Sequence, residues 1–463
     1  MKNRRVCSGC IVLAILMWAT AWTQAEEHWP GWRGPDGGGI ADESGLKLEW
    51  GPEKNLLWKT AIPGKGHSSP IVWGDRIFLT TSIRGEKLED ASPPKHLLNG
   101  EEFTHPQWAG ADHSWTLKLL CLDRSSGRVL WERTAYQGAV YDYIHQAGSY
   151  AAPTPVTDGE SVWAYFGAEG LYSYDFEGNL KWKTDLGPIG TVGMGTGTSP
   201  VLYKDKLLLV CDQEFDGKDS FALALDKNTG QQLWKVQREI AVTWATPLLV
   251  EGREGPQMVV SGASEVVSYD PEDGSELWRT EGVVSNAIPS PVSDGRLVFV
   301  SAGSAAKRVM ALRLELDEDG PVNQGATPEQ VSGARDGEAQ AAGSSPSAQE
   351  QDAEAEEPPA DPRIVWRYDK GAAYVPSPIY YQGLFYLIND RGQITALDAQ
   401  TGQVIYQERL PDEGRVASSL VAADGKILAT TLDGRTYVFK AGRQFEVLAS
   451  NQVGEPVWAS LAI

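Results

Sequence analysis

Cysteine is scarce in this chain of 463 residues, which contains only four. Cys7 and Cys10 lie in the first ten residues, whereas Cys121 and Cys211 each lie in an apolar stretch that predicts a β-strand. No two cysteines are adjacent, and their number and spacing exclude a disulfide scaffold and a cysteine-based zinc site. We expect Cys121 and Cys211 to be buried free thiols that pack as small apolar side chains.

Positive charge is also in short supply. The chain has 41 Lys and Arg against 62 Asp and Glu, which gives a net charge of −21. So acidic a chain lacks the excess of cations that neutralises nucleic-acid phosphates, and it should not adhere to anionic membrane surfaces. The expected partner is therefore a protein or a small molecule, and not nucleic acid.

The longest apolar run lies near the N-terminus, at residues 11–21, behind basic residues within the first five positions. Thr23-Gln24-Ala25 offers a cleavage site, so residues 1–25 are predicted to be a signal peptide. The run is short for a membrane span, although an uncleaved anchor is the alternative. We expect export to the periplasm or cell envelope, without stable membrane insertion after the signal is removed.

What the chain has in abundance is one repeated turn. Residues 225–234 read Leu-Asp-Lys-Asn-Thr-Gly-Gln-Gln-Leu-Trp, in which a strand enters a turn at Asp226 and a second strand leaves Gly230 and carries Trp234. The Asp side chain can bond turn amides and Gly can adopt positive φ, so the stretch predicts a β-hairpin. The pattern recurs at residues 123–131, 175–182, 270–278 and 398–406, where Tyr406 replaces the Trp.

A second signature keeps the same interval. A Ser-Pro or Thr-Pro step opens a strand at residues 69, 154, 199, 246, 290 and 377, and Ser418-Ser419 and Ser460-Leu461 hold the register without Pro. Five of the seven intervals are 41–47 residues, the length of a four-stranded propeller blade. The other two, of 85 and 87 residues, each contain one Trp-bearing strand and are interpreted as single blades with insertions.

The sequence therefore predicts an all-β fold, an eight-bladed β-propeller at residues 55–463 that follows an irregular segment at residues 26–54. Asn55–Thr60 matches an outermost Trp strand, and Val457–Ile463 begins an eighth innermost strand. The two chain ends would then share the last blade, which is incomplete. We expect about 20 further residues to be needed for its two middle strands. The alternative is a closed seven-bladed ring with residues 55–60 appended.

Two insertions interrupt the predicted propeller. Residues 84–114 contain His96, His105, Trp108 and His113, and histidines scattered through a loop are expected to be solvated. Residues 317–361 carry twelve acidic residues and one Arg, and this composition predicts a disordered loop. The loop at residues 212–217 matches the first half of a calcium loop, but Leu223 stands where the terminal Glu would be, so no metal site is predicted.

The repeated unit resembles the tryptophan-docking motif of the PQQ-like β-propeller repeat family. Residues 29–35 and 67–75 resemble exported, uncharacterised members of that family. The family includes PQQ-dependent alcohol dehydrogenases and the propeller lipoprotein of the outer-membrane assembly machinery. The resemblance implies a structural role, docking between neighbouring blades, for the Trp residues at the recurring position: Trp58, Trp131, Trp182, Trp234, Trp278 and Trp366.

The resemblance implies a fold more strongly than an activity. The dehydrogenases carry a vicinal cysteine pair over the quinone, and this chain has none. Their calcium ligands and catalytic Asp have no counterpart that we can place here. No cofactor is therefore expected, and PQQ is kept only as an alternative.

Functional residues are expected at one mouth of the propeller channel. The residues three before each Pro-equivalent position should ring that mouth, and they are His67, Ala152, Gly197, Trp244, Ile288, Val375, Val416 and Trp458. Three of these side chains, His67, Trp244 and Trp458, together with Gln213 of a nearby inner loop, are the predicted ligand-binding residues. The predicted function is an exported, non-enzymatic binding or scaffold module without catalytic residues. The alternative is a shortened PQQ-dependent dehydrogenase.

Overall fold

The computed structural model describes residues 28–463 except 43, 284–285, 305–306, 317–360 and 413. The predicted signal peptide and nearly all of the predicted acidic loop lie outside the described residues. Within them, every regular element is a strand apart from one 3₁₀ turn, η1 (Gly167–Glu169). None of the described segments forms a helix long and apolar enough to cross a membrane.

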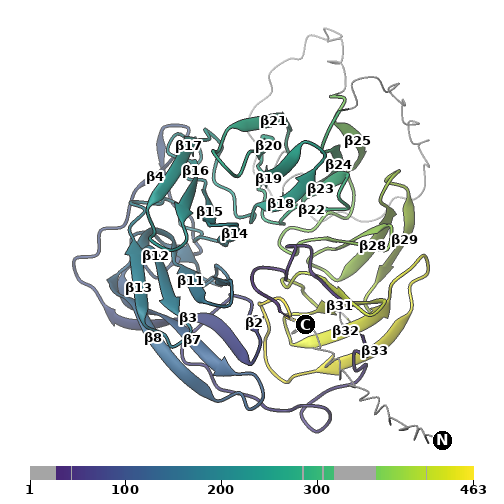
Figure 1. Cartoon of the computed structure of the whole chain (residues 1–463), viewed down its shortest axis with the longest axis horizontal. Coiled ribbons are helices and arrows are strands. Elements are labelled where there is room, and N and C mark those ends of the chain that lie inside the picture. The colour runs from purple at the N-terminus through teal and green to yellow at the C-terminus, as the bar shows by residue number, and fades with distance from the viewer. Residues whose placement is uncertain (1–27, 43, 284–285, 305–306, 317–360, 413) are drawn as a thin grey trace, which may run out of the picture.

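Most of the described strands form seven blades, each an antiparallel sheet of four strands in chain order. The blades surround a common centre, and the first strand of each blade is the innermost (Figure 1). The first three are β2 (Ile71–Trp73), β3 (Arg76–Lys87), β7 (His113–Asp123) and β8 (Val129–Ala139); β10 (Val156–Thr157), β11 (Ser161–Tyr165), β12 (Leu171–Asp175) and β13 (Leu180–Thr184); and β14 (Val201–Tyr203), β15 (Lys206–Cys211), β16 (Phe221–Asp226) and β17 (Gln232–Gln237).

The remaining four sheets continue around the ring in chain order. They are β18 (Leu248–Gly252), β19 (Gly255–Ser261), β20 (Glu265–Tyr269) and β21 (Glu276–Glu281); β22 (Val292–Ser293), β23 (Leu297–Ala302), β24 (Arg308–Arg313) and β25 (Ile364–Tyr368); β26 (Ile379–Tyr381), β27 (Leu384–Ile388), β28 (Gln393–Asp398) and β29 (Val404–Arg409); and β30 (Val421–Ala423), β31 (Lys426–Thr430), β32 (Arg435–Lys440) and β33 (Val447–Gln452). We number these sheets as blades one to seven.

A closed ring of eight hydrogen bonds joins the blades at the channel. In each bond the backbone N–H of one Ser or Thr donates to the hydroxyl oxygen of the corresponding residue in the next blade, at 2.9–3.1 Å. The members are Ser69, Thr154, Ser199, Thr246, Ser290, Ser377, Ser419 and Ser460. The ring has eight members, which agrees with the predicted eight blades.

The two ends of the propeller sequence meet at the eighth position, but they do not form the innermost and outermost strands that were predicted there. Ser460 donates to Ser69, so blade seven does not close directly on blade one. Trp58 lies against Gly127 of blade one, and its indole N–H donates to the Arg124 carbonyl at 2.8 Å. No strand is assigned to residues 55–60 or 457–463, although both are described.

The repeated turn acts as a platform for a Trp of the preceding blade. In blade three, Asp226 accepts hydrogen bonds from the amides of Asn228 and Thr229, and Gly230 has a φ of 71°. A β-carbon at Gly230 would lie 2.6 Å from the Trp182 ring, so only glycine fits under the indole. Trp58, Trp131, Trp234 and Trp366 stand over glycines of the next blade in the same way.

Trp278 departs from this pattern, since no glycine among the described residues lies under its ring. The chain between β24 and β25, where blade five would supply the turn, is the long acidic insertion. The Trp278 indole N–H instead donates to Gln257 within its own blade, at 2.7 Å. The Arg363 guanidinium lies 4.6 Å from the centre of its ring and covers the indole in place of the glycine.

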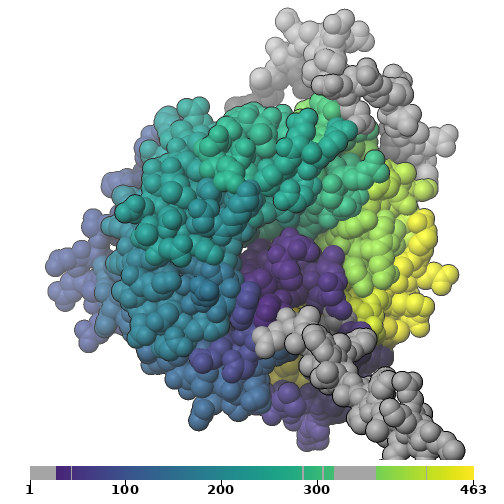
Figure 2. Space-filling model, in the orientation of Figure 1, coloured from purple at the N-terminus to yellow at the C-terminus, as the bar shows by residue number. Residues whose placement is uncertain are grey.

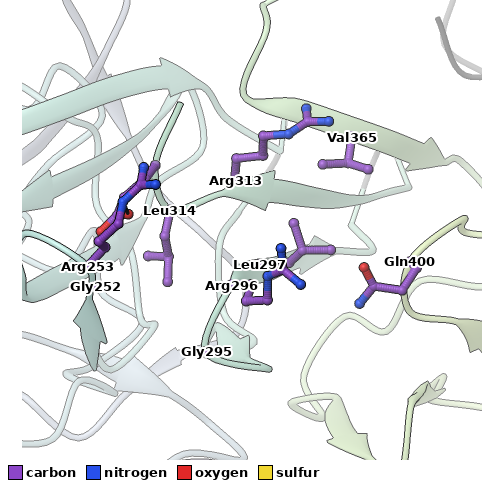
Figure 3. A pocket seen from close by; sticks show the side chains of 10 residues that line it. Gly252, Arg253, Gly295, Arg296, Leu297, Arg313, Leu314, Val365 and Gln400 are labelled. Carbon is purple, nitrogen blue, oxygen red and sulfur yellow. Dashed lines mark ion pairs between the residues drawn. The ribbon is translucent and has the colours of Figure 1, made fainter. Parts of the chain in front are cut away.

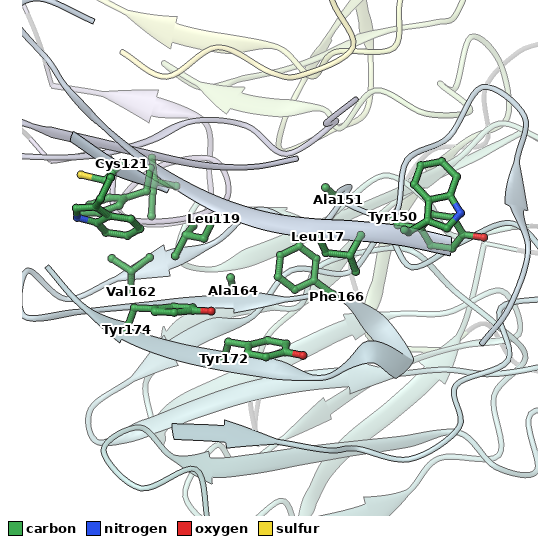
Figure 4. Packing of buried hydrophobic residues seen from close by; sticks show 14 of the residues in the cluster. Leu117, Leu119, Cys121, Tyr150, Ala151, Val162, Ala164, Phe166, Tyr172 and Tyr174 are labelled. Atoms are coloured by element: carbon green, nitrogen blue, oxygen red, sulfur yellow. The ribbon is translucent and has the colours of Figure 1, made fainter. Parts of the chain in front are cut away.

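The apolar core lies between neighbouring blades. Leu117, Leu119 and Cys121 of β7 face Val162 and Tyr174 of blade two (Figure 4). Cys121 and Cys211 are both buried free thiols, as predicted from the sequence. Burial, the main influence, raises the pKa of the Cys121 thiol to about 11 and that of Cys211 to about 12, so neither is a ready nucleophile.

The N-terminal segment crosses the ring and fills its centre on one face (Figure 2). Trp29 exchanges two backbone hydrogen bonds with Val72 of blade one, both at 2.8 Å, and the short strand β1 (Ile40–Ala41) adds in parallel to β30 of blade seven. Between them, Trp32 donates to Ser290 of blade five. The segment predicted to be irregular is therefore mostly without regular structure but closely bound.

Arg33 is the most buried charge of this segment. It is only 2% exposed, and its Nη2 donates to the carbonyls of Gly38, Pro378 and Leu420. Burial lowers its pKa to about 9, because no described carboxylate offsets the loss of solvent. The guanidinium thus binds the N-terminal segment, through carbonyl groups alone, to the residues that directly precede β26 and β30.

We predict that Trp234→Ala lowers the free energy of unfolding by about 3–5 kcal/mol, because it empties a buried aromatic site between blades three and four. Leu233→Ala is the matched control, since Leu233 precedes it on β17 and is 46% exposed. Denaturant midpoints of the two variants measure the difference. Equal, small losses for both would refute the docking role of the indole.

Candidate functional site at the channel mouth

The predicted mouth residues lie in the connections that lead into the innermost strands. This face of the propeller is opposite the one that the N-terminal segment, residues 29–41, covers. His67 and Trp458 are brought together from the two ends of the propeller sequence, and their rings stack at 5.0 Å between centroids with 7° between planes. Trp244 lies against Gly197, and its indole N–H donates to the Gly195 carbonyl at 2.8 Å. The mouth thus has the His67–Trp458 stack on one side and the Trp244 indole on another.

His67 is the polar group of this mouth. Its Nε2 is buried and has no hydrogen-bond partner among the described residues. Burial, with a smaller contribution from Lys65, lowers its pKa to about 4, so the imidazole is neutral at physiological pH. The neutral ring has one unused nitrogen, but because this Nε2 is buried, a ligand would have to displace the groups that cover it to form a hydrogen bond there.

Gln213 is held by protein groups. Its Oε1 accepts from the Gly190 amide at 3.0 Å, and its Nε2 donates to the Asp219 carbonyl at 2.8 Å. A ligand would compete with both bonds. The neighbouring Asp212 carboxylate is likewise occupied by Arg238 and Thr243, so the oxygens that began the calcium-like pattern serve a buried ion pair.

The insertion of blade one folds over blades two and three on the mouth face. Within it, β4 (His96–Leu98) pairs with β5 (Glu101–Phe103), and its β6 (Trp108–Ala109) pairs with β9 (Ile144–His145) of the link to blade two. Trp108 stacks on Tyr143 at 5.1 Å and donates to the Val192 carbonyl. The insertion therefore packs against the aromatic link at residues 141–146.

The expectation that the histidines of this insertion are solvated is wrong for His96, which is 0% exposed. Its Nε2 bonds Asp142 at 2.9 Å and its Nδ1 bonds Glu214 at 2.8 Å. Two carboxylates that face two ring nitrogens require both nitrogens to carry protons. Burial alone would lower the pKa of His96, but the hydrogen bonds to Asp142 and Glu214 outweigh it and raise the pKa to about 9.

The Asp142 carboxylate accepts several hydrogen bonds beneath the insertion. Besides His96, it accepts hydrogen bonds from the amides of Tyr143, Thr191 and Gly193. Sequence reasoning missed this cluster because its members lie up to 118 positions apart. The only local signal was the unusual aromatic content of residues 141–146.

A small pocket beside Asp142 contains the buried carboxyl group of Glu169. Burial is the main cause that raises the pKa of Glu169 to about 7, although the Tyr141 amide donates to it. The pocket has a volume of about 20 Å³, which is room for one water molecule and not for an organic substrate. Among the described residues, no group of three His, Cys, Asp or Glu side chains is placed to hold a metal ion.

Comparison with known proteins agrees with the propeller geometry. A family model described as outer membrane protein assembly factor BamB matches residues 114–219 and 218–459. No match was found among the curated proteins.

Two solved structures were compared over most of the chain. The quinohemoprotein alcohol dehydrogenase from Comamonas testosteroni has 10% identity and a TM-score of 0.53, over 94% of this chain and 74% of that chain. BamB from Moraxella catarrhalis has 11% identity and a TM-score of 0.49, over 83% of this chain and 93% of that chain. Identities this low bear on the fold alone.

The His96 cluster predicts a specific pH dependence. The folded pKa of about 9 lies above the ordinary value of 6.5, so the imidazolium stabilises the fold fully below about pH 6.5. This contribution, at most ~3 kcal/mol, is lost as the pH rises through about 9. Denaturant unfolding between pH 6 and pH 10 should show that His96→Gln removes this part of the pH dependence.

His105→Gln is the matched control, because His105 lies in the same insertion but outside the two-carboxylate cluster. It should keep the pH dependence of the unmodified chain. If His96→Gln and the unmodified chain lose stability in parallel over the same range, the ion cluster does not stabilise the fold.

Proposed function

This chain belongs to the PQQ-like propeller family whose matching model is described as outer membrane protein assembly factor BamB, and we propose that it is an exported, non-enzymatic binding module. Its channel mouth would bind a segment of a protein partner. The periplasm or cell envelope is the proposed location, in keeping with the predicted signal peptide and with the family described. The matched description names an assembly factor, which is a role carried out through protein contacts.

One observation carries this proposal, the stack of His67 on Trp458 at a mouth whose opposite face is closed by residues 29–41. Trp458 is 37% exposed and offers an apolar surface, while the buried Nε2 of His67 has no described partner. Flat aromatic surface with one polar contact suits an extended, uncharged peptide segment or a similar small group. The closed opposite face leaves the mouth as the route of entry.

A quinone cofactor fits these residues poorly. PQQ carries three carboxylates, which call for cations or a bound metal. None of the eight residues that surround the mouth is charged, since His67 is neutral, and the neighbouring Lys65 ammonium already donates to the Ala147 carbonyl. The chain also has no vicinal cysteine pair. The shortened dehydrogenase remains the second candidate because the structural likeness includes a quinohemoprotein, and we derive no catalytic step through the quinone.

Site-specific photo-crosslinking in producing cells tests the binding proposal. A photoreactive amino acid at position 458 should give a discrete protein adduct, and His67→Ala should weaken that adduct. The matched control is position 277, an exposed residue on the outer strand β21. Equal adducts at both positions, or none at 458, would contradict a binding mouth.

The same purified chain tests the second candidate. After incubation with PQQ and gel filtration, the protein peak should carry no quinone absorbance. Co-eluting quinone together with alcohol-dependent dye reduction would favour the dehydrogenase over the binding module.

A further inference from the structure

A second concavity lies on the opposite face of the propeller from the mouth, between blades four, five and six (Figure 3). It has a volume of about 520 Å³, within the usual range for a small-ligand site. The residues that line it come from the hairpin of blade four, the hairpin and third strand of blade five, and the repeated turn of blade six.

The polar lining of this pocket is mainly cationic. Among the described lining residues, Arg253, Arg296 and Arg313 stand against one carboxylate, that of Glu315. This local excess of positive charge stands out in a chain of net charge −21. Charged groups around a concave, partly enclosed surface focus the electrostatic potential there.

The three arginines differ in the ion pairs and hydrogen bonds that they already form with other protein groups. Glu315 forms an ion pair with Arg253 at 2.9 Å. Arg313 donates through Nη1 to the Pro362 carbonyl at 2.9 Å, and its Nη2 and Nε make no described hydrogen bond. The Arg296 guanidinium has no described partner, and Figure 3 shows it in the middle of the lining residues.

Asp294, another carboxylate of this hairpin, makes no described ion pair with Arg296. Asp294 accepts hydrogen bonds from the amides of Arg296 and Leu297 through Oδ1 and from the Gln400 side chain through Oδ2. These bonds fix the turn that presents Arg296 to the pocket. They also hold Gln400 at the pocket's other side.

We propose that this pocket binds a multivalent oxyanion, such as a phosphate or a polycarboxylate, between Arg296 and Arg313. Guanidinium groups suit this chemistry because they offer several N–H donors in a plane and stay charged at any physiological pH. The apolar side chains of Leu297 and Leu314 in the same lining would accommodate a carbon skeleton attached to the anion. The site is independent of the proposed binding mouth.

Isothermal titration of the full chain with inorganic phosphate, citrate and chloride tests the proposal. Phosphate or citrate should bind saturably, at concentrations below about 10 mM, and chloride should not. Preference between phosphate and citrate distinguishes a phosphorylated ligand from a polycarboxylate. Arg296→Gln and Arg313→Gln should each weaken the binding about tenfold, the usual cost of one charge-assisted contact.

Two further variants distinguish a loss of the binding site from a loss of binding through unfolding. Glu315→Gln removes the carboxylate found among the described lining residues while keeping an acceptor oxygen, so it should tighten binding, an effect that unfolding cannot mimic. Arg443→Gln is the control, because Arg443 is exposed and lies outside the pocket. Absence of saturable binding by phosphate and citrate, or unchanged affinity in both pocket arginine variants, would overturn the proposal.

Discussion

The ring of hydrogen bonds around the channel is the interaction on which the remaining architecture depends. Each member donates its backbone N–H to the next blade, and its hydroxyl oxygen accepts the backbone N–H of the previous blade. The position therefore needs a side-chain acceptor close to the main chain. Six members precede a Pro, yet Ser419 and Ser460 precede Leu and make the same bonds. The hydroxyl is therefore the required part of the repeated step, and the Pro accompanies it.

The second constraint is the contact of each outer Trp with a glycine turn of the next blade. Where this contact is complete, as for Trp182 on Gly230, the blades meet closely from the channel to the rim. At Trp278, Arg363 lies over the indole, and a pocket lined by arginines is formed by residues 252–253, 295–297, 313–315, 365 and 400 of blades four to six.

The propeller could be predicted from the sequence because its contacts repeat at a fixed interval. The Ser and Thr positions were found by spacing, whereas the docking role of the Trp residues was implied by the family resemblance. Trp278 departs from that role, and the two strands expected in a shared eighth blade are not formed. His67 and Trp458 were placed at one mouth by the same register, although their stacking was not foreseen. For Gln213, the sequence could not show that nearby backbone groups occupy both ends of its amide.

Contacts that occur once in the fold could not be read from a repeat. His96 meets Asp142 and Glu214 across 46 and 118 positions, and nothing in its own neighbourhood distinguishes it from His105. Arg33 likewise reaches Pro378 and Leu420 from the other end of the chain. Both are polar groups whose burial depends on which distant loops meet them, a property of tertiary structure and not of local pattern.

The most direct test of this account is the unfolding free energy of Ser199→Ala compared with Ser199→Thr. Ala removes the oxygen that accepts the Thr154 amide at 2.9 Å and leaves that buried donor unpaired, which should cost about 1–3 kcal/mol. Thr keeps the hydroxyl, and Thr246 occupies an equivalent ring position, so it should stay close to the unmodified chain. If Ala is as stable as Thr, the ring does not hold the blades together.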